Sequence, residues 1–195
     1  LLVFTMVLHP MGGSVDYLIR IRNVILVTHI IAIASLPVGW VGFWGLTSAI
    51  GSDRILSLLA FAMASIGVLA ALIAAATNGL ILPIYLDHLK DLSAAGIESV
   101  RPILRYGGAI NQAFDYVYTF SFCGAIICWC IGGLFTRGLP RWLAWTGIVL
   151  SGVIVFVFAF GIAQQDLSGL RWFISGIVIW TVLAGYALYR SRNVE

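Results

Sequence analysis

The chain has 195 residues, of which 61% are hydrophobic and 10% charged, and its mean hydropathy is +1.03. Soluble domains carry about 45–50% apolar and about 25% charged residues, so this chain cannot cover its surface with polar groups in water. A net charge of +3 without a basic stripe argues against nucleic-acid binding, and 3 cysteines are too few for a disulfide scaffold. The composition predicts an integral membrane protein.

The first apolar segment, residues 1–8, is short. As a helix it would cover only about 12 Å, well under half of the hydrocarbon thickness of a bilayer. The sequence does not begin with Met, and no basic residues precede the apolar stretch as they would in a secretory signal. We therefore expect residues 1–8 to be the end of a first span whose beginning is absent from this chain.

Five longer windows follow, each with the ~20 apolar residues that a helix needs to cross a bilayer. They are residues 24–50, 55–82, 110–135, 142–162 and 170–188. Short polar segments separate most of them, and one longer segment covers residues 85–108. The predicted fold is an all-α, polytopic transmembrane helix bundle in one domain, with five full spans and a partial sixth at the start.

Two connecting segments have the pattern of helices that lie along a membrane surface. Ser14 is a favourable N-cap for a short amphipathic helix. Residues 85–105 repeat apolar side chains at helical spacing, and Gly96 and Pro102 interrupt that repeat. We expect one short interfacial helix after Ser14 and two more within residues 85–105.

The basic residues give a prediction of orientation. Side A denotes the membrane side that receives segment 85–108, and side B denotes the side that receives the turns at 51–54 and 136–141 and the C-terminus. The 11 basic residues divide almost evenly between the sides, but those on side B flank helix ends directly. They are Arg137, Arg141, Arg190 and Arg192. This favours a cytoplasmic side B and therefore a cytoplasmic C-terminus.

Polar residues of the predicted spans gather in the half of the membrane that faces side A. Asp115 and His29 are the deepest of them, and Asp115 shares one helical stripe with Asn111, Tyr118 and Phe122, at spacings of four, three and four. Ionisable residues at this depth usually face a bundle interior or a wet cavity. The alternatives are headgroup contact near the helix ends and a purely structural Asp115. The candidate binding residues are His9, His29, Asn78, Asn111, Asp115, Tyr118 and Gln165.

Small residues form two further stripes. One, at spacings of four and three, consists of Ala60, Ala64, Gly67, Ala71, Ala74 and Asn78. The other consists of Gly39, Gly42 and Gly45. Small side chains let helix backbones approach closely in membranes, so both stripes predict close helix packing.

These patterns favour a non-enzymatic function. The leading interpretation is a protein that binds a lipid, quinone or pigment in the side A leaflet, or an accessory subunit whose partners are membrane lipids and other membrane-protein subunits. The alternative is an intramembrane enzyme that acts on a lipid-like substrate, with Asp115 and His29 as acid and base. A small transporter ranks third, because the side B half offers no polar path across the membrane.

A bound haem or metal is a weaker alternative. His29, with His9 or Asp115, would supply the ligands. However, His9, His29 and His88 show no His-x-x-x-His spacing, and His29 alone lies well inside a predicted span. Helical histidines that bind one metal are typically four residues apart, so the pattern gives this reading little support.

Overall fold

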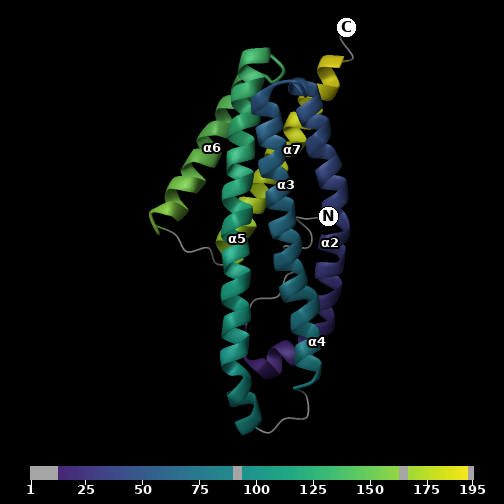
Figure 1. Cartoon of the computed structure of the whole chain (residues 1–195), viewed down its shortest axis with the longest axis vertical. Coiled ribbons are helices and arrows are strands. Elements are labelled where there is room, and N and C mark those ends of the chain that lie inside the picture. The colour runs from purple at the N-terminus through teal and green to yellow at the C-terminus, as the bar shows by residue number, and fades with distance from the viewer. Residues whose placement is uncertain (1–12, 90–93, 163–166, 193–195) are drawn as a thin grey trace.

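The computed structural model describes residues 13–89, 94–162 and 167–192, and within them the chain is almost entirely helical (Figure 1). The elements are α2 (Val15–Gly51), α3 (Ile55–Ala76), the π-helical turn η1 (Thr77–Ile81), α4 (Leu82–Asp87), α5 (Ala94–Thr136), α6 (Arg141–Ala159) and α7 (Leu167–Arg192). None of the described residues lies in a strand. The all-α prediction is confirmed.

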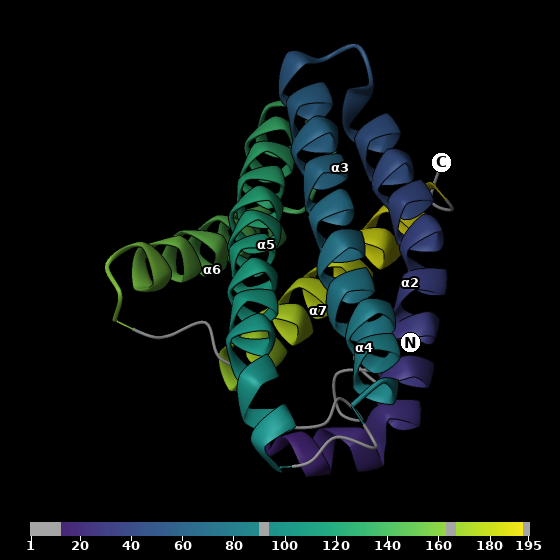
Figure 2. The same cartoon turned by 60° about the horizontal axis from the view of Figure 1, so that its bottom comes forward.

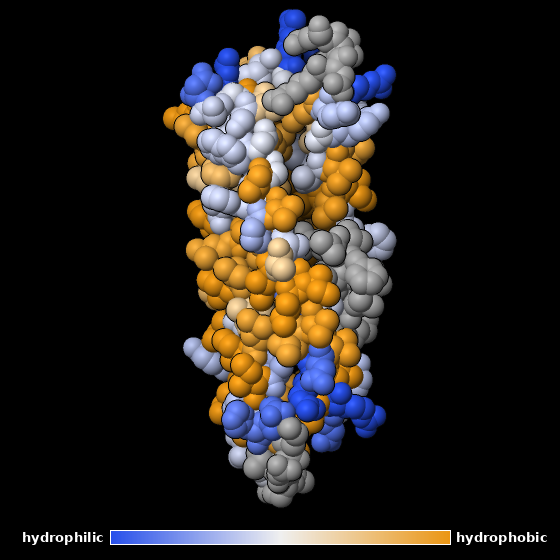
Figure 3. Space-filling model, turned by 90° about the vertical axis from the view of Figure 1, so that its right-hand side faces the viewer, coloured by the Kyte–Doolittle hydropathy of each residue, from blue (hydrophilic) through white to orange (hydrophobic). Residues whose placement is uncertain are grey.

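Five helical segments are long and apolar enough to cross a membrane. They are α2, the continuous run of α3, η1 and α4, and then α5, α6 and α7. Figure 3 shows the matching surface, with hydrophilic residues at the two ends of the molecule and hydrophobic residues between them. These features indicate an integral, multi-pass membrane protein with five helices that could cross the bilayer. The predicted partial span at residues 1–8 lies outside the described residues.

The start of α2 extends beyond the predicted window. Ser14 caps the helix, and its Oγ accepts a hydrogen bond from the Tyr17 amide at 3.3 Å. The helix then continues without a break to Gly51, so no separate short helix follows Ser14. Figure 2 shows the purple first turns of α2 lying across one end of the bundle before the helix turns along the long axis. That these turns rest on a membrane surface stays a prediction.

The segment before the fourth window also differs from expectation. α5 begins at Ala94 and passes through both Gly96 and Pro102, so the prediction that these residues break the segment into short helices is wrong. Pro102 removes one backbone donor from the helix. Its side chain is exposed near the end of the bundle, where water can bond the carbonyl that loses its partner. The helix therefore tolerates the proline.

The main packing contact joins α3 and α5, and small residues of α3 make it possible. Ala60 and Ala64 are fully buried. Gly67 is buried too, and a β-carbon at this position would lie 2.6 Å from the ring of Phe122. The side B half of this small-residue stripe is thus the close-packing edge that the sequence predicts. It positions the ring of Phe122 at the boundary between the core and the side A half.

The hydrophobic core lies mainly in the side B half, around Trp129 of α5. Trp129 is fully buried, and its Nε1–H donates to Thr47 Oγ1 of α2 at 3.0 Å. Its ring also stacks on Phe43, with centroids 5.6 Å apart. An indole N–H buried among hydrocarbon is costly unless it is bonded, so this contact fixes α2 against α5.

The buried residues of α6 lie in its first two thirds, and Ile154 and Val155 are partly buried against the same core. The buried residues are Leu143, Ala144, Gly147 and Ser151. Trp180 of α7 donates from Nε1 to the Leu143 carbonyl at 3.1 Å. Figure 1 shows α6 leaning away from α5 toward its C-terminal end.

Candidate functional site

A pocket of about 280 Å³ lies among α2, α3, α5 and α7, with η1 adding one residue to its wall. Its lining is mostly alanine, leucine, isoleucine, valine and phenylalanine, and its polar groups are few. Pockets of this kind between the helices of a bundle are common ligand sites. Its position between four helices that are separate in sequence makes it the natural candidate site.

The predicted binding residues meet in this pocket. His29 comes from α2, Asn78 from η1, and Asn111, Asp115 and Tyr118 from α5, and all five line the same cavity. The remaining two candidates, His9 and Gln165, lie outside the described residues. The structure thus brings together every predicted site residue that it describes.

The α5 wall is the stripe that the sequence spacing predicts. Asn111 Nδ2 donates to Asp115 Oδ2 at 2.8 Å, one helical turn away. Tyr118 continues the stripe, and its ring contacts Phe122 edge-on with centroids 4.9 Å apart. A second edge-on contact, at 5.6 Å, joins Tyr118 to Phe173 of α7. The stripe therefore passes from a carboxyl–amide pair to a packed aromatic cluster.

His29 is held firmly in the α2 wall. Its side chain is 7% exposed, and its Nδ1 lies 2.8 Å from the carbonyl oxygen of Ile25. Because a carbonyl only accepts hydrogen bonds, Nδ1 carries a proton in this arrangement. Gly79 packs against the same ring, since a β-carbon at position 79 would lie 2.0 Å from His29 Cβ.

Gly79 lies in the π-helical turn η1, which also carries Asn78. A π-turn adds a residue to one turn of a helix and often occurs at functional sites. Here it places Gly79 against His29 and Asn78 on the pocket wall. The sequence gives no signal for this turn, because hydrophobic periodicity does not distinguish it from a continuous α-helix.

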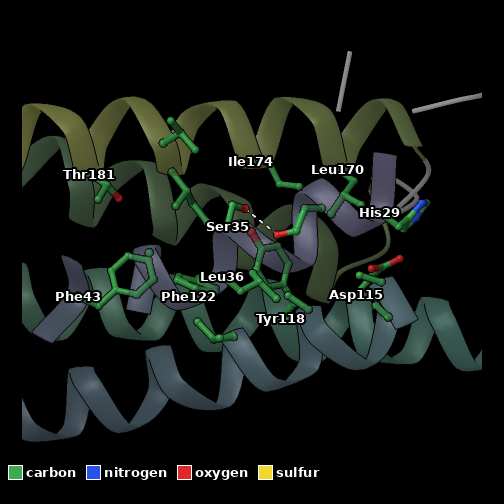
Figure 4. Close-up of a pocket in the computed structure, with 18 of the residues that line it drawn as sticks. His29, Ser35, Leu36, Phe43, Asp115, Tyr118, Phe122, Leu170, Ile174 and Thr181 are labelled. Carbon is green, nitrogen blue, oxygen red and sulfur yellow. Dashed lines mark hydrogen bonds between the residues drawn. The ribbon is translucent and has the colours of Figure 1, made fainter. Parts of the chain in front are cut away.

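The pocket has a polar end and an apolar end. Figure 4 shows His29 and Asp115 at one end, with Phe43 and Thr181 at the other and Ser35, Leu36 and Tyr118 between them. On the α3 side the wall consists of Val68 and of small residues, and the small residues leave the space unfilled. They are Ala71, Ala74 and Ala75. The side A half of the small-residue stripe therefore lines a cavity instead of a helix contact.

Within the part of the chain that the structure describes, one side of the pocket is open between α2 and α7. Gly39 and Gly42 line it, and a β-carbon on either glycine would meet no described atom within 4 Å. The same holds for Gly45. The prediction that these three glycines form a close-packing edge is therefore wrong, because no described neighbour approaches that face of α2. Val182 of α7 also lines the pocket and is 63% exposed, so the cavity continues to the lateral surface of the bundle.

The α7 wall was missed by sequence reasoning. Leu170, Ile174, Ile177, Val178 and Thr181 line the pocket from this helix. They follow helical spacing, but apolar residues all around a membrane helix give no sign of which face meets a cavity and which meets lipid. Only a polar residue would mark the face of α7 that meets the cavity, and Thr181 is the only polar residue among these five.

Metal-ligating groups are sparse here. Among the described residues, no group of three or more His, Cys, Asp or Glu side chains could hold a metal ion. Within the described lining of the pocket, His29 and Asp115 are the groups of these types. A haem or metal at this site would draw on that pair, as the sequence suggests.

A second cavity, of about 230 Å³, lies beside the side A end of α2 and α4. Arg22 Nε and Asp87 Oδ1 form an ion pair across it at 3.1 Å. Both side chains are partly exposed, at 29% and 52%, so the pair is worth less than about 1 kcal/mol. It marks where α2 and α4 meet near the membrane surface.

Comparison with protein families, with curated proteins and with solved structures finds no match to this chain.

Proposed function

We propose that this protein is a non-enzymatic membrane protein that binds a lipid-like molecule in the pocket between α2, α3, α5 and α7. The observation that carries the proposal is the division of that pocket into a polar end and a long, mostly apolar remainder, in which Ser35 and Thr181 add only hydroxyl groups. A lipid, quinone or pigment has the same division. Its polar group would meet His29 and Asp115, and its apolar part would extend along α2 and α7.

The lateral opening supports this function over transport. Gly39 and Gly42 have no side chains to close the wall of the pocket between α2 and α7. An apolar molecule therefore reaches the site from the bilayer without crossing water. The core around Trp129 closes the bundle toward side B. A route across the membrane would need polar groups through that core, and the described core is mostly apolar, with hydroxyl groups such as those of Thr47 and Ser151 but no buried Asp, Glu, Lys or Arg side chain.

Native mass spectrometry of protein extracted gently from its own membrane tests the proposal, because it detects bound small molecules and partner subunits together. We expect wild-type protein to carry a fixed extra mass. Ala71→Leu, which adds bulk to the pocket wall, should lose that mass. Ala62→Leu on the exposed face of the same helix is the matched control and should keep it. Equal loss in both variants, or no bound mass in the wild type, would refute the proposal.

An accessory-subunit role is compatible with ligand binding, and the same experiment reports on it. A larger assembly in the spectrum would make this chain one subunit of that assembly, with its pocket as a binding site within it. A single chain or homo-oligomer with a bound small molecule would assign the function to this protein alone.

An intramembrane enzyme is the second candidate, because His29 and Asp115 lie at the same end of one pocket (Figure 4). A carboxyl group and an imidazole in such a place are able to exchange protons with a substrate. Asp115→Asn separates the two functions. An enzyme would lose turnover in this variant and still bind its ligand, whereas a binding protein would convert no bound molecule either before or after the change.

A further inference from the structure

The polar end of the pocket lacks the groups that an anionic lipid requires. None of its described lining residues is a lysine or an arginine, and Asp115 supplies a carboxyl group there. A phosphate or carboxylate that leaves water for a membrane interior needs a cation beside it. Anionic headgroups therefore match this site poorly. This argues against acidic phospholipids and fatty acids as its ligands.

The same groups favour an uncharged head over a cationic one. Asn111 already donates a hydrogen bond to Asp115 at 2.8 Å, so this carboxyl group has an amide partner. Asn78 and Asn111 bring amides that both donate and accept, and Tyr118 brings a phenol. A hydroxyl or carbonyl group forms hydrogen bonds with these amides and this phenol. An ammonium group only donates hydrogen bonds, so it would pair with the acceptors and leave the donors without a partner.

The shape of the pocket limits the apolar part of the ligand. Its α2 wall runs from His29 to Phe43, which is about 20 Å of helix at 1.5 Å per residue. Its volume of about 280 Å³ lies below the range of about 300–1,000 Å³ found for most ligand pockets. A long and narrow cavity of this size suits one chain, and a molecule with two acyl chains or a broad macrocycle would exceed it.

We infer that the pocket selects an uncharged, single-chain lipid whose head is a hydroxyl or carbonyl group, as in a long-chain alcohol or ketone. The head lies between His29 and Asp115, and the chain lies along α2 and α7 past Gly42. This inference rests on the proposed binding function and adds the chemical class of the ligand.

Photoreactive probes with one chain and different heads test this class. Hexadecanol, hexadecanoic acid and hexadecylamine, each with a diazirine near the chain end, are added to the protein in phosphatidylcholine vesicles, and cross-linked residues are mapped by mass spectrometry. The alcohol should label residues 35–43 of α2 and 174–182 of α7 at least about tenfold more than the acid or the amine, a difference of about 1.4 kcal/mol in binding.

Two glycine variants show whether the label comes from the pocket. Gly42→Leu should abolish labelling by the alcohol, because its side chain would fill the opening that Gly42 lines. Gly45→Leu lies one turn further along α2, outside the pocket lining, with equally open space around its β-carbon. It should label like the wild type. A fold defect would affect both variants.

Asp115→Asn tests where the head lies. With the carboxyl group replaced by an amide, the acid probe should label several-fold more than it labels the wild type. A preference for the acid or amine in the wild type, or labelling that ignores the head, would overturn the inference and leave the pocket as a binding site. Absence of pocket labelling by all three probes would overturn the proposed function itself.

Discussion

A β-carbon at Gly79 would lie 2.0 Å from Cβ of His29 and 2.2 Å from its Cγ. Two membrane segments therefore meet at this point with no space for any side chain at position 79. The π-helical turn Thr77–Ile81 supplies the close approach, and His29 in turn lines the pocket. The position of the histidine in the site thus depends on a glycine that touches no ligand.

Gly79→Ala should destabilise the protein by about 1–3 kcal/mol, the usual cost of forcing an extra methyl group into a packed site. In a helix alanine is normally better than glycine by about 1 kcal/mol, so the sign of the effect identifies the clash with His29. The measurement is thermal unfolding in detergent micelles. Gly108→Ala is the control, because a β-carbon there meets no described atom within 4 Å. A stabilised Gly79→Ala variant would contradict the close contact.

Thr47→Val should cost about 1 kcal/mol, the size typical of hydrogen bonds between membrane helices. It removes the acceptor for Trp129 Nε1 while keeping the shape of the side chain, and Thr47 is fully buried. Equilibrium unfolding provides the measurement. Thr146→Val is the matched control, because Thr146 is exposed and its hydroxyl donates within its own helix to Leu143. Equal effects in the two variants would show that the interhelical bond contributes nothing specific.

The sequence predicts the α5 wall of the pocket well, and the reason is local. Asn111, Asp115 and Tyr118 lie on one helix, so their spacing alone determines that they share a face. The five helices that could span the membrane follow equally from length and hydropathy. The shared face of α5 and the apolar length of each helix are both properties of a single segment, so neither depends on how the helices pack together.

The rest of the site depends on how helices meet, and periodicity within one helix carries no such information. Gly39 and Gly42 resemble a packing edge in sequence, yet they border open space. Gly67, with the same small-residue pattern, lies against Phe122. The difference lies in which neighbour faces each glycine. The contact between Gly79 and His29 adds a π-turn that has no local signature.

Gly147→Ala should loosen the attachment of α6. A β-carbon there would lie 2.5 Å from Cys130 Sγ and 2.6 Å from Trp180 Nε1. The clash pushes α6 away from α5 and α7, which exposes the fully buried Cys130. Modification of Cys130 by a membrane-permeant maleimide, quantified on its peptide, should become faster. Gly152→Ala on the same helix has open space and should leave the rate unchanged. Unchanged reactivity in Gly147→Ala would show that α6 adapts without moving.

The side B turns provide a test of topology. The turns near Ser52 and Gly138 lie together, because a β-carbon on Gly138 would lie 3.6 Å from Ile50 Cα. His88 lies at the other end of the run Ile55–Asp87, which is long enough to cross a bilayer. In protein whose three cysteines are replaced by alanine, Ser52→Cys and Arg141→Cys should react with an impermeant maleimide from the same side of sealed vesicles. His88→Cys should react only from the opposite side.

The orientation prediction adds a direction to that result. If side B is cytoplasmic, as the arginines at its helix ends favour, the cysteines at 52 and 141 react only in inside-out vesicles. Reaction of these two in right-side-out vesicles would reverse the orientation and leave the bundle intact. Reaction of the cysteines at 52, 88 and 141 from one side would contradict the topology itself, because it would mean that the run from Ile55 to Asp87 does not cross the membrane. The pocket and its lateral opening would then no longer face lipid as proposed.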